Sequence, residues 1–174
     1  FIMNLASVAK MLQLFGIFGE ASGAKLNRSK CKGMAVCSNE INPMHKTGIT
    51  WEDTIKIYGI FFGHRGQQLT QDFILTKLQD TMEFHQRRSL TMRGKSLIIN
   101  VLFLTRLWYA GTIIIFEKTF IEKVQRKIFK FLWRTTEWLA RLTVIGPVDQ
   151  GGLGVFDLKT RLAALRIMHL RQFA

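Results

Sequence analysis

Twenty consecutive residues, LIINVLFLTRLWYAGTIIIF at 97–116, constrain the fold of this chain more than any other stretch. The run approaches the length of a membrane-spanning helix, but Arg106 lies at its centre and Asn100 near its start. A central arginine costs about 2.5–3.5 kcal/mol on membrane-insertion scales. Gly111 followed by Thr112–Ile115 indicates a helix end and a change to extended chain. We therefore expect a helix buried in a protein core, with a membrane-associated helical protein as the weaker alternative.

Apolar residues at helical spacing predict further amphipathic helices on both sides of this run. We expect helices over about 2–19, 70–86 and 117–134, and a last helix from an Asp157 cap to about 173. The residues expected to face inward are Leu5, Val8, Ala9, Leu12, Phe15 and Phe18, then Phe73, Leu75, Leu78, Met82 and Phe84, then Leu97, Ile98, Val101, Leu102, Leu104 and Trp108, then Phe120, Val124, Ile128, Phe131 and Leu132, and finally Leu158, Leu162, Leu165 and Leu170.

Extended and turn-forming segments separate these helices. Ile49–Phe62 is rich in isoleucine and aromatic residues and predicts strands, with Gly59 allowing a bulge or a close backbone approach. Ala24–Val36 is short and basic and suits a turn flanked by strands, and Asn42-Pro43 marks a loop. Val144–Val155 contains GGLG and predicts a tight turn that leads into a strand.

The positive charge of the chain is concentrated in its middle third. The net charge is +13, and residues 63–135 contribute +8 of it, from 13 basic and 5 acidic side chains. Such an excess favours polyanions, with nucleic acid first and an anionic membrane surface second. Arg87, Arg88, Arg93 and Lys95 precede the apolar run, where Ser89 and Thr91 can each cap a helix start. Lys123, Arg126, Lys127, Lys130 and Arg134 form a second basic stripe at helical spacing.

Residues for catalysis or metal binding are not evident in the sequence. Cys31 and Cys37 fit two reduced thiols, since no second Cys/His pair completes a zinc site. GGLGV lacks the lysine–serine ending of a phosphate-binding loop. Glu52 and Asp53 would point to opposite faces of a strand, so they are poorly placed to share a metal. The residues alone therefore predict nucleic-acid binding without catalysis.

Five blocks occur in a familiar order: SGAKLNRSKCKGM at 22–34, IKIYGIFFG at 55–63, RRSLTMRGKSLIIN at 87–100, FKFLWR at 129–134 and GGLGVFDLKTRLAALRI at 151–167. Together they resemble the C-terminal half of the reverse transcriptase of LINE-type non-LTR retrotransposons, over nearly the whole chain. The resemblance implies an α+β, mostly helical fold. The resemblance divides the chain into three parts. Residues 1–62 would be the C-terminal part of a palm, with a helix and short antiparallel strands. Residues 63–135 would be a thumb-like helical bundle, and residues 136–174 a post-thumb turn–helix connection.

The resemblance also implies roles for single residues. Lys30 matches the terminal lysine of the fourth palm motif, a position proposed to protonate the pyrophosphate leaving group; a solvated turn lysine or a simple phosphate contact is the alternative. Ile57, Tyr58 and Gly59 correspond to the primer grip, which holds the 3′ end of the primer. The cations of the thumb, Arg87, Arg88, Arg93, Lys95, Lys123, Arg126, Lys127 and Lys130, would then contact the backbone of an RNA–DNA hybrid.

The chain departs from the family pattern at two places. Tyr58 stands where a leucine is common, and Phe84-His85 stands where a tryptophan is usual. The catalytic aspartates would lie before Phe1, which stands inside an apolar pattern without an initiator methionine, so we expect a piece of a longer protein that is inactive alone.

Partners and surroundings follow from the same resemblance. We expect an RNA template, a DNA primer and the rest of the polymerase (fingers and catalytic palm) as partners, with no membrane. Mg²⁺ is implied for the full-length enzyme only, with no cofactor bound by this chain. We also expect an intracellular location in cytoplasm and nucleus, since no signal peptide or transmembrane segment is evident. The alternative is a non-catalytic basic module, derived from such an element, that binds nucleic acid or protein.

Overall fold

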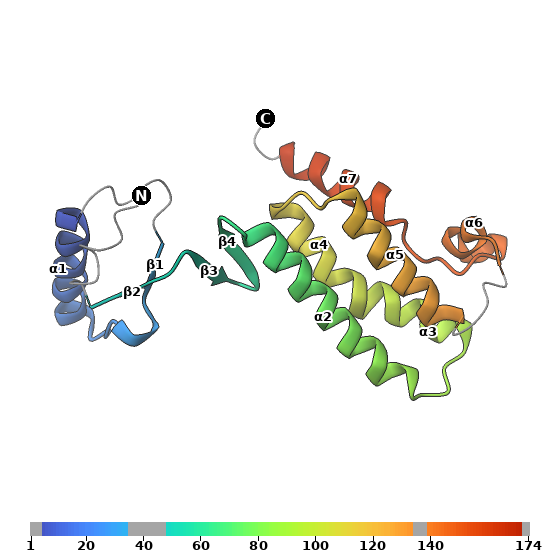
Figure 1. Cartoon of the computed structure of the whole chain (residues 1–174), viewed down its shortest axis with the longest axis horizontal. Helices are drawn as coiled ribbons and strands as arrows, with labels where there is room; N and C mark the ends of the chain where they lie inside the picture. Colours follow the sequence, from blue (N-terminus) through green and yellow to red (C-terminus); the bar gives the residue numbers. More distant parts are fainter. Residues whose placement is uncertain (1–4, 35–47, 134–138, 172–174) are drawn as a thin grey trace. The chain divides into compact units, whose positions relative to one another are not determined.

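The structure of the chain, a computed structural model, describes residues 5–34, 48–133 and 139–171. The chain divides into two compact units, Phe1–Gly66 and Gln67–Ala174, and each is described by itself (Figure 1). The predicted fold class, α+β and mostly helical, is confirmed. The strands of the described residues all lie in the first unit, and the described part of the second unit is helical. The predicted loop at Asn42-Pro43, together with Cys37, lies outside the described residues.

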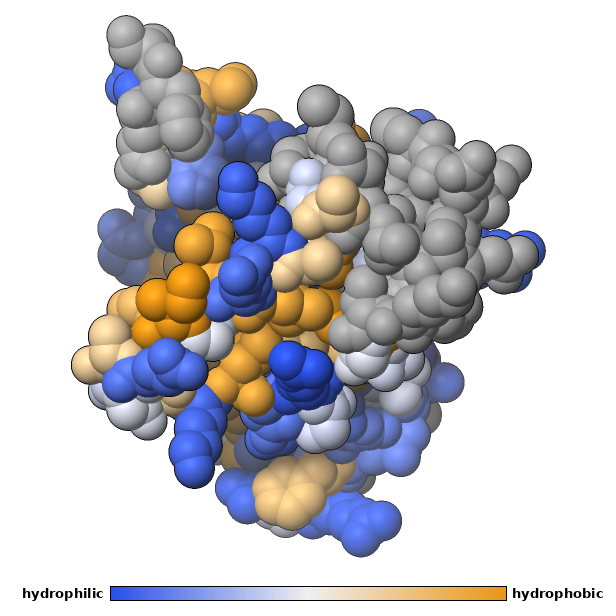
Figure 2. Space-filling model, turned by 90° about the vertical axis from the view of Figure 1, so that its left-hand side faces the viewer, coloured by the Kyte–Doolittle hydropathy of each residue, from blue (hydrophilic) through white to orange (hydrophobic). Residues whose placement is uncertain are grey.

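The first unit begins with helix α1 (Leu5–Ser22), which continues through Gly19. It ends where Gly23 adopts a φ of +73° and donates its N–H to the carbonyl of Gly19 at 2.9 Å, a common helix C-terminus. Of the residues expected to face inward, Val8 is buried, but Phe15 and Phe18 are exposed. Figure 2, which views the molecule from the α1 side, shows hydrophobic residues at this surface.

A short parallel strand pair follows α1. The 3₁₀ helix η1 (Arg28–Lys30) precedes β1 (Lys32–Gly33), which pairs in parallel with β2 (Thr50–Trp51). The Trp51 ring lies against Gly33, where an added Cβ would sit 2.7 Å from it. The turn predicted for Ala24–Val36 is therefore present, but in the described part of that stretch only its downstream strand forms.

Strands β3 (Thr54–Ile57) and β4 (Ile60–Gly63) form an antiparallel hairpin with Ile57 opposite Ile60. The two turn residues, Tyr58 and Gly59, both have positive φ, 48° and 88°. This is the signature of a type I′ turn, whose twist matches that of the two strands. The predicted strands are confirmed, but Gly59 is not a bulge. An added Cβ there would meet no atom within 4 Å, so glycine is favoured at this position by its positive φ and not by a close contact.

Tyr58 occupies a backbone conformation that favours glycine or asparagine. Replacing Tyr58 with asparagine is expected to raise the free energy of unfolding of the first unit by about 1 kcal/mol, because asparagine tolerates positive φ. Native-state amide hydrogen exchange of the β3 and β4 residues measures this change. The Tyr58→Ala variant is the control, since it removes the exposed ring but keeps the backbone strain. Equal gains in the two variants would contradict the assignment to backbone conformation.

The second unit is a bundle built around one long central helix. Its helices are α2 (Gly66–Gln86), α3 (Met92–Ile98), α4 (Leu104–Ile113), α5 (Lys118–Trp133), α6 (Arg141–Ile145) and α7 (Leu158–Leu170). A π-helical turn, η3 (Ile99–Phe103), joins α3 to α4 without a break, and these three elements together form the central helix, Met92–Ile113. A 3₁₀ turn, η4 (Val148–Gln150), lies between α6 and α7.

The core of this unit lies where the central helix meets α5 and α7. Helix α3 packs against α5, and α7 packs against both α4 and α5 (Figure 1). The rings of Phe103 and Phe131 meet edge to face with centroids 5.0 Å apart. All five residues predicted to face inward from α5 are buried, so the prediction for that helix is confirmed.

The prediction for the central helix is partly wrong. Leu104 is buried as expected, but Leu97, Val101 and Leu102 are exposed, and the buried face is formed instead by Ile99, Phe103, Leu104, Leu107 and Ala110. The segment is apolar on both sides, so its hydrophobic period does not specify which side packs. Phe84 of α2 and Leu170 of α7 are likewise exposed.

By length and composition alone, the helix Met92–Ile113 could cross a membrane. Core helices of water-soluble bundles pass the same test. In this unit its buried face packs against other helices. Arg106 donates to the backbone carbonyl of Lys77 and to the hydroxyl of Thr81, both on α2 and both at 3.1 Å. The expected core helix is therefore the arrangement that the structure shows.

Candidate nucleic-acid interface

The basic segment that runs from the end of α2 into the first turn of α3 presents three exposed arginines. Thr91 caps α3, because its hydroxyl accepts the N–H of Gly94 at 3.1 Å, so Thr91 forms the cap expected at this helix start. Arg87, Arg88 and Arg93 are exposed. The Arg88 guanidinium lies 4.9 Å from the centroid of the Phe84 ring, one turn earlier on α2, which restrains the side chain without neutralising its charge.

Lys95 is used differently from these arginines. Its ammonium donates to the backbone carbonyl of Leu132 at 2.7 Å, in a partly buried position at the end of α5. The last carbonyls of a helix lack intrahelical partners and carry partial negative charge. Lys95 therefore satisfies the C-terminus of α5 and joins that helix to α3.

Replacing Lys95 with methionine is expected to lower the free energy of unfolding by about 1–2 kcal/mol, since the Leu132 carbonyl loses a charged donor. Methionine keeps much of the length and apolar volume of the stem. Urea denaturation followed by circular dichroism measures the change. Arg93→Met is the matched control, because Arg93 is exposed on the same helix. Equal losses in the two variants would contradict this role for Lys95.

Two further polar residues of the motif at 87–100 bind the glycine-rich segment at 151–154. Ser96 donates to the carbonyl of Leu153 at 2.6 Å, and the Asn100 amide donates to the carbonyl of Gly154 at 2.8 Å while accepting the Phe156 N–H at 3.2 Å. The turn predicted at GGLGV is confirmed, with positive φ at Gly151 and Gly154. The predicted strand is wrong, because side chains of α3 and η3 and the backbone of 143–147 satisfy this segment.

The basic stripe of α5 is mostly open to solvent. Lys123, Arg126 and Lys130 are exposed, and Arg134 lies outside the described residues. Lys127 is half-buried and donates to the side-chain oxygen of Gln79 on α2 at 2.6 Å. Arg126 approaches Glu122 at 4.0 Å, a surface pair that contributes little.

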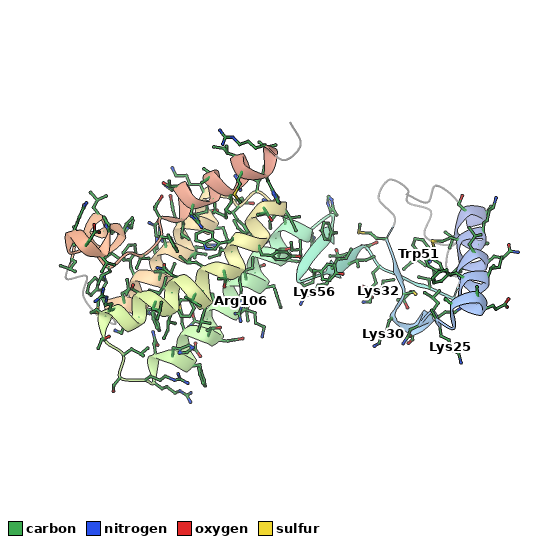
Figure 3. The ribbon with its side chains drawn as sticks, turned by 180° about the vertical axis from the view of Figure 1, so that it is seen from behind. Lys25, Lys30, Lys32, Trp51, Lys56 and Arg106 are labelled. Atoms are coloured by element: carbon green, nitrogen blue, oxygen red, sulfur yellow. The ribbon has the colours of Figure 1, made fainter. Side chains whose placement is uncertain are left out.

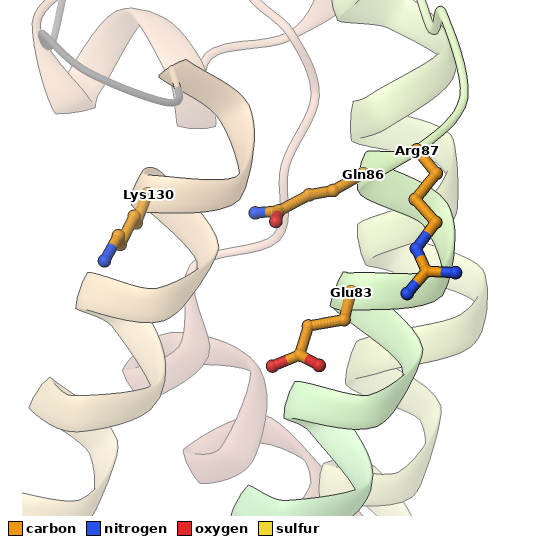
Figure 4. Close-up of a pocket in the computed structure, with 4 residues that line it drawn as sticks. All are labelled: Glu83, Gln86, Arg87 and Lys130. Atoms are coloured by element: carbon orange, nitrogen blue, oxygen red, sulfur yellow. The ribbon is translucent and has the colours of Figure 1, made fainter.

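An open groove of about 400 Å³ brings the two basic segments together. Its walls are Glu83, Gln86 and Arg87 from the end of α2 and Lys130 from α5 (Figure 4). In the sequence, Arg87 and Lys130 belong to separate basic segments, and Glu83 and Gln86 are not among the predicted site residues. The sequence offers one indication that Glu83 lies beside Arg87. Gln79, Glu83 and Arg87 are spaced four residues apart, which places all three on one face of a helix.

The candidate residues of the first unit lie in η1 and in the hairpin. Lys30 is exposed, and its N–H reaches the Asn27 side chain at 3.3 Å. Lys32, which is labelled with Lys30 in Figure 3, pairs with Glu52 at 2.7 Å. Ile57 and Tyr58 are exposed at the hairpin turn, Tyr58 by 87%.

Clusters of three metal-ligating side chains are absent from the part of the chain that the structure describes. Within residues 5–34, 48–133 and 139–171, no three His, Cys, Asp or Glu side chains gather closely enough to hold a metal ion. Two-metal phosphoryl transfer needs convergent carboxylates. The Mg²⁺ that the resemblance implies for the full-length enzyme stays a prediction.

Comparison with known proteins gives a relative that a transposon encodes. The Transposon TX1 uncharacterized 149 kDa protein of Xenopus laevis is 28% identical to this chain over an alignment of 179 residues. The alignment covers 98% of this chain. The chain is related to a transposon protein. It spans 14% of the length of that relative, so the activity of the longer protein is not established for this chain. No protein-family model matches the chain.

Proposed function

We propose that this chain is part of the reverse transcriptase, an RNA-directed DNA polymerase, of a LINE-type non-LTR retrotransposon, and that its second unit holds the template–primer duplex. The observation that carries the proposal is the groove between α2 and α5. It brings Arg87 and Lys130, which are far apart in the sequence, to one open surface. The similarity to a transposon protein over nearly the whole chain supports the same origin.

The cations of this surface divide into two groups by their contacts. Arg87, Arg88, Arg93, Lys123, Arg126 and Lys130 are exposed and would contact phosphates, which hold a duplex without reading its sequence. Lys95 and Lys127 already donate to Leu132 and Gln79. These two lysines would therefore hold α3, α2 and α5 in position rather than carry most of the phosphate contacts.

The first unit would hold the primer end and contact the rest of the polymerase. Tyr58 projects from a tight turn in a strained conformation, and such strain is often found at functional sites. The exposed apolar residues of α1, Leu14, Phe15, Ile17 and Phe18, fit packing against further protein such as the fingers and the catalytic palm. Lys30 as the proton donor to pyrophosphate, the Mg²⁺ of the complete enzyme and action in cytoplasm and nucleus belong to the same proposal.

Titration of the chain into a fluorescent primed RNA–DNA hybrid at several salt concentrations tests the proposal. We expect a binding constant that falls steeply and linearly with salt on a double-logarithmic plot, because each phosphate contact releases a counterion. A binding constant that does not change with salt, or no binding at low salt, would contradict duplex holding. The second outcome would favour the alternative module that binds a protein.

A further inference from the structure

The groove between α2 and α5 contains a group that a pure phosphate site would exclude. Glu83 lines it beside Gln86, Arg87 and Lys130, and both Glu83 and Gln86 extend from α2 toward α5 (Figure 4). A carboxylate repels phosphate, by about 1 kcal/mol at 4 Å in water and more near a protein surface. A carboxylate on a surface that holds a nucleic-acid backbone therefore suits a ligand group that donates a hydrogen bond.

A chain of two hydrogen bonds, of which the second reaches the carboxylate, orients Glu83. Lys127 donates to the Gln79 side-chain oxygen at 2.6 Å, which orients the amide, and the Gln79 amide nitrogen donates to Oε1 of Glu83 at 2.6 Å. This Lys127–Gln79–Glu83 relay occupies one carboxylate oxygen. An ionised carboxylate accepts on both of its oxygens, so the second oxygen can still accept a hydrogen bond inside the groove.

We propose that Glu83 accepts a hydrogen bond from a ribose 2′-hydroxyl of the RNA strand, while Arg87 and Lys130 hold flanking phosphates. The 2′-hydroxyl is the donor that distinguishes RNA from DNA, and it is displayed in the wide minor groove of an A-form duplex. The groove then selects an RNA–DNA hybrid over a DNA duplex. This inference rests on the proposed function and adds strand discrimination to it.

The test compares three duplexes of one sequence: an RNA–DNA hybrid, the same hybrid with 2′-fluoro in place of each 2′-hydroxyl, and a DNA duplex. The 2′-fluoro strand keeps the A-form shape but cannot donate. We expect the unaltered chain to bind the hybrid roughly tenfold more tightly than its 2′-fluoro form, as for a hydrogen bond to a charged acceptor. Glu83→Ala is expected to bind the two forms equally.

Asp72→Ala is the matched control, since Asp72 is an exposed acidic residue on α2 that does not line the groove. It removes the same charge and should keep the tenfold preference. Glu83→Ala that tightens all three duplexes alike, or an unaltered chain that binds hybrid and 2′-fluoro hybrid equally, would overturn this inference alone. A chain that binds none of the three duplexes would overturn the proposed function instead.

Discussion

Replacing Gly152 with alanine is expected to lower the free energy of unfolding by about 3 kcal/mol. An added Cβ would overlap the carbonyl group of Gly146 and lie 2.8 Å from the Gly146 Cα. Both partners are backbone, so no side chain can rotate away. The two chain segments of this contact are joined by hydrogen bonds from the Gly152 N–H to the Pro147 carbonyl and from the Gly154 N–H to the Gly146 carbonyl, each 2.9 Å.

The same contact sets the position of the glycine-rich segment on the bundle. If it opens, the carbonyls that Ser96 and Asn100 bind move away, and these two side chains lose their partners. Urea unfolding followed by circular dichroism measures the loss. Gly151→Ala is the control, because Gly151 has a φ of +82° but no neighbour within 4 Å, so it should cost only about 1 kcal/mol of backbone strain. Equal losses in the two variants would contradict the close-packing argument.

How much the sequence predicts depends on how cleanly each segment separates its polar and apolar sides. Helix α5 alternates buried Val124 and Ile128 with exposed Lys123 and Lys130, so its period predicts both the helix and its inward face. The central helix is apolar on both sides. The sequence predicts that this helix exists. Which of its sides is buried depends on the positions of α5 and α7, and the hydrophobic period of one segment carries no information about these positions.

The basic motif at 87–100 shows a second limit. Its charge and its Thr91 cap are visible in the sequence, and both are present. The partners of Lys95, Ser96 and Asn100 are backbone carbonyls of distant segments. Every residue has a backbone carbonyl, so no residue type marks one as a partner. The sequence therefore predicts the same role for Lys95 as for the exposed arginines, whereas in the structure Lys95 binds a backbone carbonyl of α5.

Neutralising Arg87 and Lys130 together, as Arg87→Gln with Lys130→Gln, is expected to lower the salt slope of hybrid binding by about 2 and the affinity at low salt by roughly 10- to 100-fold. The two side chains line one groove from different helices, so a duplex backbone that enters the groove contacts both. Glutamine keeps the polarity and approximate size while removing the charge. Fluorescence anisotropy with the primed hybrid measures affinity and slope.

A control must separate the groove from the general positive charge of the chain. Lys118→Gln with Lys159→Gln removes the same two charges from exposed positions of the second unit that do not line the groove. Long-range attraction depends on net charge and would weaken equally in both double variants. Direct phosphate contact would not, because counterion release counts only the phosphates that the protein neutralises. A control variant that loses as much slope as the groove variant would show that binding is diffuse, and the groove would then have no special part in holding the duplex.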